Sequence, residues 1–103
     1  MDATEKIFAY GSLKDPNVQQ KVLGKKVSVT PDRLEGCIES DFEHVTTKTR
    51  PIILSPFARH GISGVTFAVT TADLQKIDQY QSNFYHREKV TLKSGDSAWA
   101  YVK

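Results

Sequence analysis

The segment KIFAYGSL, residues 6–13, joins a short apolar run to a turn near the N-terminus. Residues 7–10 are apolar without alternation, which is typical of a strand that is buried on both faces. Gly11 ends the run, and glycine permits backbone conformations and close approaches that other residues do not. We therefore expect the main-chain amides of Gly11, Ser12 and Leu13 to converge on one small anionic or carbonyl oxygen. The alternative is an ordinary turn that leaves a core strand.

Length and composition favour one domain over residues 1–103, because 103 residues leave no room for a second core. The formal net charge of +2 is mild and the basic residues are scattered, which argues against a dedicated nucleic-acid-binding protein. Cys37 is the only cysteine, so no intramolecular disulfide can form and we expect a reducing, cytoplasmic location. No apolar run has the length of a signal or membrane-spanning segment, so we expect no membrane association.

The first helix is predicted to begin at Pro16, which suits the first helical position because its missing N–H is not needed there. Asp15 is the predicted N-cap. Gly24 is predicted to end this helix after about two turns.

Residues 27–54 are rich in β-branched and aromatic side chains and predict two strands joined by a polar region at 39–41. Pro51 should bend the second strand or place it at an edge, because proline cannot donate a hydrogen bond to a ladder. Residues 62–69 alternate well enough to predict a further strand.

A second helix is predicted after Thr70, where Thr70 as N-cap and Asp73 three residues later form a variant of the capping box. One face of this helix carries four residues at helical spacing: Leu74, Ile77, Asp78 and Gln81. We therefore expect Gln81 to face the core or a cleft beside it.

The C-terminal part predicts an antiparallel hairpin, with strands over 84–92 and 97–102 around a turn at 93–96. The whole order mixes about six strands with two short helices and lacks the regular alternation of a doubly wound sheet. We predict an α+β fold with a small, mixed, strongly bent, barrel-like sheet, since many short strands need few exposed edges.

Several kinds of catalytic site find no support in the sequence. The histidines lie far apart and Cys37 has no nearby partner, so no metal is expected. Neither Ser12 nor Cys37 lies in a nucleophile elbow. No phosphate-binding loop or dinucleotide fingerprint is present, so we expect no cofactor.

Three segments together resemble the gamma-glutamylcyclotransferase family, which includes gamma-glutamylamine cyclotransferases and small bacterial and plant avirulence-induced-gene-like proteins. They are FAYGSL at 8–13, Gly-x-x-Gly-Val-x-Phe at 61–67 and DLQKIDQYQSNFYHR at 73–87. The resemblance implies a small mixed β-barrel with helices outside it. It also implies a cavity in which the loop from Tyr10 to Leu13 holds a small ligand, with Tyr85 lining the pocket.

In the family's enzymes the α-amine of a γ-glutamyl group attacks its own γ-carbonyl, which gives 5-oxoproline and a free amine. Such a transferase needs amide donors for carboxylate or oxyanion charge and a carboxylate that moves the proton. The family's catalytic Glu directly follows the Asp-x-Tyr unit, and this sequence has Gln81 there. A carboxamide still forms hydrogen bonds but does not titrate, so Gln81 cannot act as a general base.

Three functions follow from this departure. The favoured one is a protein that binds a γ-glutamyl or similar amino-acid-derived ligand, with weak or absent turnover. The second is an active cyclotransferase that uses Asp78 as base, with Glu88 and His86 as further candidates. The third is an interaction or nucleic-acid-binding module on the same fold. Arg87 is a candidate for binding a carboxylate or for an ordinary solvated strand position.

Overall fold

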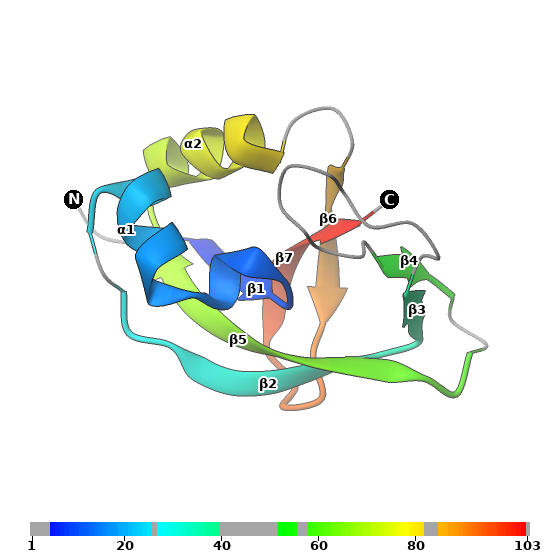
Figure 1. Ribbon diagram of the computed structural model, residues 1–103. Coiled ribbons are helices and arrows are strands. Elements are labelled where there is room, and N and C mark those ends of the chain that lie inside the picture. The colour runs from blue at the N-terminus through cyan, green and yellow to red at the C-terminus, as the bar shows by residue number, and fades with distance from the viewer. Residues whose placement is uncertain (1–4, 26, 40–51, 56–57, 82–84, 103) are drawn as a thin grey trace.

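The computed structural model describes residues 5–25, 27–39, 52–55, 58–81 and 85–102. Its elements are, in chain order, β1 (Glu5–Ala9), a 3-10 turn η1 (Ser12–Lys14), α1 (Pro16–Leu23), β2 (Thr30–Glu35), β3 (Cys37–Glu39), β4 (Ile52–Leu54), β5 (Gly61–Val69), α2 (Thr71–Gln81), β6 (His86–Thr91) and β7 (Ser97–Val102). The strands form one seven-stranded sheet in the order β2-β5-β1-β7-β4-β3, and β6 pairs with β7 outside this path. Strand β7 is parallel to β1 and β4, and the other pairs are antiparallel. The predicted α+β class with a curled mixed sheet is confirmed (Figure 1).

Strand β1 is central because it pairs with β5 on one edge and β7 on the other. Ile7, Phe8 and Ala9 are all at most 3% exposed, which confirms the predicted burial on both faces. Both helices lie on the same side of the curled sheet (Figure 1). The end of β1 therefore leads from the middle of the sheet toward the helices.

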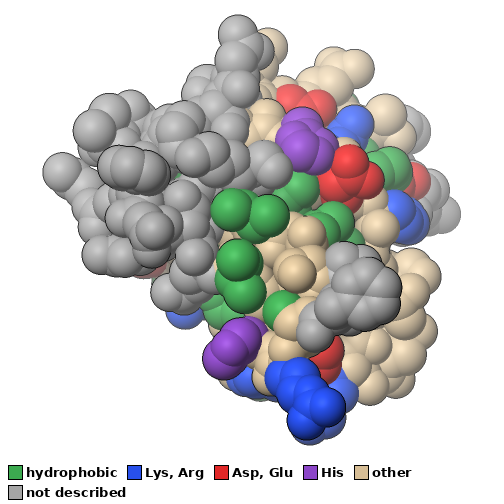
Figure 2. Space-filling model, turned by 90° about the vertical axis from the view of Figure 1, so that its right-hand side faces the viewer, with side chains coloured by type: hydrophobic (Ala, Val, Ile, Leu, Met, Phe, Trp, Pro, Cys, Tyr) green, Lys and Arg blue, Asp and Glu red, His purple; other side chains and the backbone are tan. Residues whose placement is uncertain are grey.

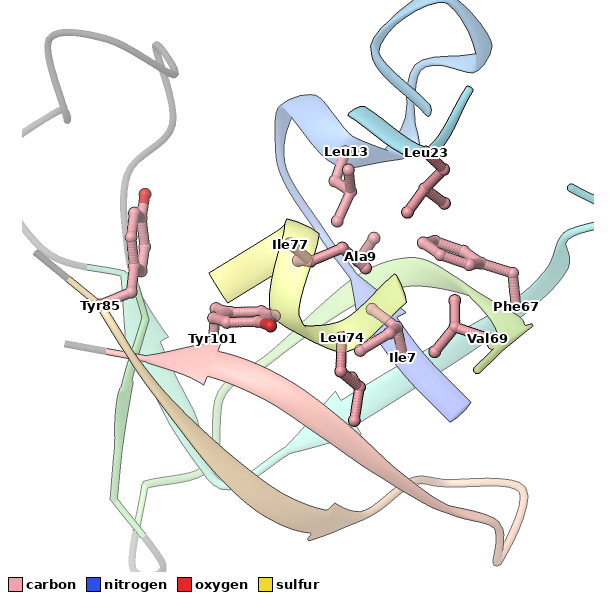
Figure 3. Close-up of a cluster of buried hydrophobic side chains, with 10 residues drawn as sticks. All are labelled: Ile7, Ala9, Leu13, Leu23, Phe67, Val69, Leu74, Ile77, Tyr85 and Tyr101. Carbon is pink, nitrogen blue, oxygen red and sulfur yellow. The ribbon is translucent and has the colours of Figure 1, made fainter. Parts of the chain in front are cut away.

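Successive residues of β1 and β7 contribute to different core clusters, as strand alternation requires. The cluster on the helix side of the sheet is drawn in Figure 3 and contains Ile7, Ala9, Leu13, Leu23, Phe67, Val69, Leu74, Ile77, Tyr85 and Tyr101. The cluster on the other face contains Phe8, Tyr10, Leu34, Cys37, Ile52, Leu92, Ala98, Ala100 and Val102. Burial of both clusters away from water supplies a substantial part of the driving force for folding.

The predicted helix ends are confirmed. The side chain of Asp15 accepts a hydrogen bond from the amide of Asn17 at 2.8 Å, and Gly24 ends α1 in the left-handed conformation. At α2, the Thr70 amide donates to the Asp73 carboxylate and the Asp73 amide donates to the Thr70 hydroxyl, both at 3.1 Å. Asp73 thus replaces the usual Glu of a capping box.

In the region predicted as two strands, the described residues form three. Gly36, with a positive φ of 73°, separates β2 from β3, and the amides of Gly36 and Cys37 both donate to the His60 carbonyl. A side chain at that φ is disfavoured, so the break depends on glycine. Residues 40–51, which include Pro51 and most of the predicted polar connection, lie outside the described residues. The predicted strand at 62–69 and the C-terminal hairpin are confirmed as β5 and as β6 with β7.

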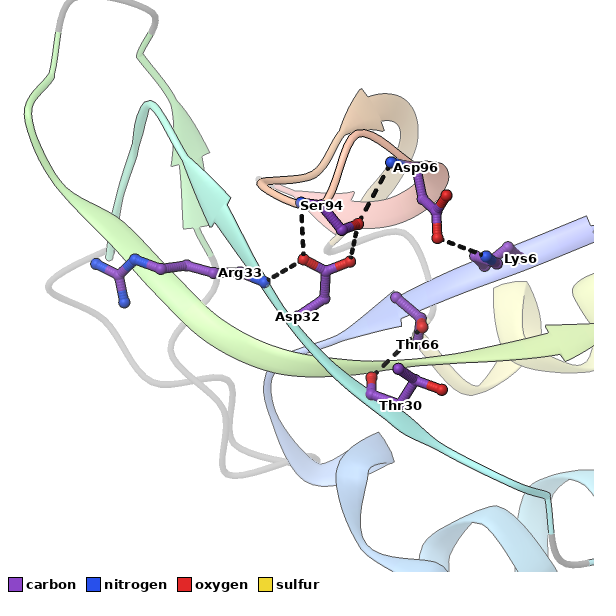
Figure 4. Close-up of polar contacts among 7 residues, drawn as sticks. All are labelled: Lys6, Thr30, Asp32, Arg33, Thr66, Ser94 and Asp96. Carbon is purple, nitrogen blue, oxygen red and sulfur yellow. Dashed lines mark hydrogen bonds and ion pairs between the residues drawn. The ribbon is translucent and has the colours of Figure 1, made fainter.

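Contacts between β2 and the turn after β6 close one end of the curl (Figure 4). The Asp32 carboxylate accepts hydrogen bonds from the Ser94 hydroxyl at 2.5 Å and from the amides of Arg33 and Ser94. The Ser94 hydroxyl is the main cause that lowers the pKa of Asp32. Lys6 of β1 reaches the same turn through an ion pair with Asp96.

The side of the molecule that carries β3 and β4 shows hydrophobic side chains at the surface (Figure 2). Ile38, Ile53 and Leu54 are each 37–40% exposed there. Among the described residues, neither helix has the length and apolar character needed to cross a membrane.

Candidate functional site

A small cavity lies where the end of β1, the η1 turn and the end of α2 meet. Its lining consists of Phe8, Ala9, Tyr10, Gly11, Ser12, Leu13, Gln81, Tyr85 and Tyr101. The cavity measures about 20 Å³, which is room for about one water molecule. The structure therefore brings the predicted binding residues from both ends of the chain to one place, without Asp78.

The loop is shaped by hydrogen bonds within the chain. The amides of Lys14 and Asp15 donate to the carbonyls of Gly11 and Ser12, each at 3.0 Å. The buried side chain of Gln19 in α1 donates to the Leu13 carbonyl at 2.9 Å. Sequence reasoning missed Gln19, although it lies four residues before the buried Leu23 and therefore on the same helical face.

The two hydroxyl side chains of the loop are engaged with other elements. The Tyr10 hydroxyl donates to the Tyr101 carbonyl at 2.5 Å and accepts from the Ile52 amide at 3.1 Å. The Ser12 hydroxyl lies 2.8 Å from the Tyr80 hydroxyl in α2. These contacts position the loop against the sheet and the helix, so both residues support the shape of the cavity.

Gln81 is the polar side chain that α2 contributes to the cavity. It is only 9% exposed, and no hydrogen bond among the described residues involves its carboxamide. The amides of Gly11 and Leu13 likewise donate no hydrogen bond within the described part of the chain. A carboxamide has both donor and acceptor atoms, so this group has the capacity to form hydrogen bonds with a molecule in the cavity.

A larger groove of about 650 Å³ adjoins the cavity. Its lining consists of Asp78, Gln79, Tyr85, His86, Arg87, Trp99 and Tyr101. Tyr85 and Tyr101 line both spaces; Tyr85 directly precedes β6 and Tyr101 lies in β7 (Figure 3). The cavity and the groove are therefore neighbours that share an aromatic wall.

Asp78 lies in the groove. One carboxylate oxygen accepts a hydrogen bond from the Tyr101 hydroxyl at 2.5 Å, and the other faces the Arg87 guanidinium at 3.6 Å. Burial and the negative charge of Asp78 raise the pKa of Tyr101, so its phenol stays protonated and acts as a donor. Tyr101 was missed from the sequence, because only the register of β6 with β7 places it beside Asp78.

The other two candidate bases, Glu88 and His86, lie on β6 rather than on α2. Glu88 is opposite Ala100 in the β6–β7 ladder, and Ala100 belongs to the core cluster on the face away from the helices. Glu88 pairs with His86 at 3.1 Å and lines neither space, whereas His86 borders the groove. No described group of acidic, histidine or cysteine side chains is arranged to hold a metal ion.

Arg87 stacks over the Trp99 ring, with its guanidinium carbon 4.7 Å from the ring centroid. Its Nη1 atom is buried and has no hydrogen-bond partner among the described residues. The indole of Trp99 in turn donates to Glu5 at 2.6 Å. The guanidinium is thus held in place by an aromatic surface rather than by acceptors.

These observations define a curled α+β half-barrel with a small polar cavity between a Tyr-Gly-Ser-Leu loop and the end of a helix. The family model that matches residues 7–103 is described as gamma-glutamyl cyclotransferase, AIG2-like. The chain therefore belongs to this family, as the three sequence segments indicated.

Solved structures agree on the fold. An Arabidopsis thaliana protein determined in solution has a TM-score of 0.79 at 21% identity, over 99% of this chain and 65% of its own. A Mus musculus AIG2-like protein has a TM-score of 0.66 at 23% identity, over 99% of this chain and 78% of its own. A third solved structure, described as gamma-glutamyl cyclotransferase, has a TM-score of 0.67 at 17% identity, over 95% of this chain and 65% of its own. No curated protein sequence matches this chain.

Proposed function

We propose that this protein binds a γ-glutamyl compound in the cavity and converts it to 5-oxoproline weakly or not at all. One observation carries the proposal: Gln81, a residue only 9% exposed, lines a cavity with the Gly11–Leu13 loop, and no hydrogen bond among the described residues uses its carboxamide. A γ-glutamyl group carries an α-carboxylate, an α-amine and a γ-carbonyl. The loop amides suit its negatively charged or carbonyl oxygens, and the carboxamide can both donate and accept.

The expected loss of turnover follows from proton transfer. Ring closure forms a bond between the α-nitrogen and the γ-carbon and breaks the γ-amide bond, so a proton must pass from the attacking amine to the leaving amine. A general base and acid typically contributes about 10²- to 10⁴-fold to such a reaction. Among the nine lining residues described, none is Asp, Glu or His, and the raised pKa of Tyr101 makes its phenolate unavailable as a base.

The cavity has to widen when a ligand enters, because a γ-glutamyl group is larger than one water molecule. Tyr85 and Tyr101 form the wall shared with the groove. Both rings pack in the buried cluster on the helix side of the sheet, so widening of the cavity requires this shared wall to move. Movement of this wall would join the cavity to the groove of about 650 Å³.

The test combines binding with product detection. The purified protein is titrated with γ-glutamyl amides of glycine and of ethylamine by calorimetry, and 5-oxoproline is measured after long incubation. We expect saturable binding with product at or near background. Gln81→Ala should weaken binding of both ligands about 10-fold or more, since it removes hydrogen bonds inside a buried site.

The matched control is Gln75→Ala, on the exposed face of the same helix. It should bind both ligands as the unchanged protein does. Absence of binding to every γ-glutamyl compound, or equal binding by Gln81→Ala, would refute the proposed function.

A further inference from the structure

We infer that the edge of β6 that faces away from β7 binds an extended peptide segment of another protein by strand addition, and that this segment carries acidic side chains at alternate positions. The proposed docking site extends from Arg87 to Thr91. It includes no residue of the cavity lining, and the inference does not depend on the proposed function.

The sheet has three terminal strands, and β6 is the least protected of them. Strand β2 contains Pro31, which cannot donate to a further strand, and its Asp32 contacts the turn after β6. Strand β3 has only three residues. Strand β6 has six residues without proline or glycine, and β7 is its only partner among the described strands. Strand addition requires an edge of this kind.

The hydrogen-bonding pattern shows which main-chain groups of β6 point away from β7. The Leu92 amide, just after β6, donates to the Asp96 carbonyl at 2.8 Å, so this opposed pair is bonded across the hairpin. Bonded and non-bonded pairs alternate along an antiparallel ladder. The residues whose amides and carbonyls point to the other edge are therefore Arg87, Lys89 and Thr91.

A single bond between β2 and the end of the β6 segment shows that this edge accepts a neighbouring strand. Lys93 is next in the same alternating series, and its amide donates to the Arg33 carbonyl of β2 at 2.8 Å. No hydrogen bond among the described residues continues this pairing to Thr91 or Lys89. The two strands thus meet at the turn drawn in Figure 4, and an added strand would extend the pairing along β6.

A groove of about 430 Å³ lies beside the same half of β6. It is bordered by Thr91 and has an apolar lining of Leu34, Leu54, Ala58 and Val90. These side chains come from the ends of β2 and β4 as well as from β6. Side chains of neighbouring strands remain on the same face, so the groove can take an apolar side chain of a peptide that lies next to Val90.

The charges of β6 argue against a second copy of this chain as the occupant. Two copies of β6 that pair antiparallel across a two-fold axis place side chains of the same face opposite each other. The registers that use most of the strand are centred on Glu88 or on Lys89, so two carboxylates or two ammonium groups would meet. Like charges directly opposite each other destabilise a strand pair, and such charges are a common protection of edge strands.

The side chains of Arg87 and Lys89 set the charge of the partner. Both lie over the Trp99 ring, with the guanidinium carbon 4.7 Å and the ammonium 4.6 Å from its centroid. Their acidic neighbours are further away than a hydrogen bond requires, at 3.6 Å for Asp78 and 3.9 Å for Glu5. A strand beside β6 brings every second side chain next to this pair of cations. Acidic side chains at two alternate positions complement it, whereas basic ones add like charge.

The experiment measures peptide binding to the whole chain by fluorescence polarisation. The probes are labelled nine-residue peptides in which valine alternates either with glutamate or with lysine. A third peptide repeats the glutamate sequence with N-methyl groups on all internal amides, which removes its main-chain donors and keeps its charges. We expect the glutamate peptide to bind at least about 10-fold more tightly than either of the others.

Thr91→Pro removes one amide of the free edge without a change of charge, and it should weaken binding of the glutamate peptide about 10-fold. The matched control is Thr91→Val, which keeps the amide and should bind within about three-fold of the unchanged protein. Lys89→Glu should reduce the preference for glutamate over lysine peptide to within about three-fold. Thermal denaturation checks the folding of each variant.

Hydrogen exchange measured by NMR gives a test that needs no variant. The glutamate peptide should slow exchange of the three outward amides, those of Arg87, Lys89 and Thr91. Equal binding of the glutamate and lysine peptides, equal binding of the N-methylated peptide, or slowed exchange elsewhere but not at these amides would overturn the inference, as would absence of binding. A dimer of the free protein that already protects these amides would also overturn it, because a second copy would then occupy the edge.

Discussion

Under the proposed function, one atom of Gln81, its amide nitrogen, separates ligand binding from proton transfer. A carboxamide and a carboxylate have nearly the same shape, so replacement of one by the other preserves the lining of the cavity. The amide nitrogen removes the titratable group, and no other described lining residue supplies a carboxylate. The chemistry of the site therefore depends on a single side chain while its geometry depends on many.

The residue-scale prediction is that Gln81→Glu increases the rate of 5-oxoproline formation from γ-glutamyl ligands by about 10²- to 10⁴-fold. The new carboxyl group would be buried without a cationic partner in the cavity, so its pKa should lie above the ordinary value of about 4.3. Because a base must be ionised to accept a proton, the rate should rise with pH through that raised pKa. Chromatographic detection of 5-oxoproline between pH 5 and 8 measures both effects.

Two variants accompany this measurement. Gln75→Glu adds the same group on the exposed face of α2 and should produce no gain. The single variant Asp78→Asn, which keeps Gln81, tests the alternative base. If the product formed by the unchanged protein disappears in this variant, Asp78 is the catalytic group. Gln81→Glu that binds ligand but forms no product would show that the missing carboxylate is not what limits turnover.

At the scale of elements, α2 depends on a small polar cluster at its start. Asp73 accepts from the Thr70 amide and pairs with Lys25 at 2.9 Å, while its own side chain is only 5% exposed. Burial acts to raise the pKa of Asp73, but the hydrogen bonds from Lys25 and Thr70 and the charge of Lys25 outweigh it and lower the pKa below 3.8. The cluster connects the end of α1 to the start of α2.

The prediction at this scale is that Asp73→Ala destabilises the protein by about 1–3 kcal/mol at pH 7, through loss of the cap and of the paired carboxylate. A carboxyl group with a lowered folded-state pKa stabilises the fold above its unfolded pKa, and this contribution is lost as the pH falls through the folded value. The difference between the two proteins should therefore shrink below about pH 4. Urea denaturation at pH 7 and pH 3 measures it.

An exposed ion pair provides the comparison. Glu35→Ala removes the partner of Arg33, and its effect should stay below about 1 kcal/mol. A loss of stability in Asp73→Ala that is equally large at pH 3 would contradict the role given to its charge.

The elements differed in how far they could be predicted. Both ends of α1 and the start of α2 depend on residues within a few positions of each other, so Asp15, Gly24 and Thr70 were sufficient to place them. Strands β3 and β4 are three residues each and exist because they pair with each other across a long separation in sequence. The boundary that was missed lies at Gly36 between β2 and β3, which is why two strands were predicted where the described residues form three.

At the scale of the whole molecule, only those parts of the candidate site that lie in short sequence motifs could be predicted. The loop from Tyr10 to Leu13 and the position of Gln81 follow from short segments that carry the family resemblance. The groove depends on the register of β6 with β7, which sets Arg87 opposite Tyr101. Long-range register of this kind has no local signature, so Tyr101 and Trp99 were not expected at the site.

Tyr10 connects this larger architecture to the cavity. Its hydroxyl group donates to the Tyr101 carbonyl in β7 and accepts from the Ile52 amide in β4, although Tyr10 itself follows β1. Three parts of the curled sheet therefore meet at one buried oxygen atom. The ring, in turn, forms part of the cavity wall.

The prediction is that Tyr10→Phe lowers the free energy of unfolding by about 1–3 kcal/mol, because it leaves a buried amide and a buried carbonyl without their partner. The substitution should also have a local effect near Ile52, in addition to its effect on the stability of the whole protein. The Ile52 amide should exchange its hydrogen faster than in the unchanged protein, since that amide donates to the missing hydroxyl. Urea denaturation and hydrogen exchange measured by NMR give the two readouts.

Tyr80→Phe is the matched control because it removes a half-buried hydroxyl bonded to Ser12, outside the sheet. It should cost less stability and leave exchange at Ile52 unchanged. If Tyr10→Phe leaves both the stability and the exchange of Ile52 unchanged, the Tyr10 hydroxyl does not hold the strands together, and closure of the curl must depend on the contacts of Asp32 with the turn at 93–96.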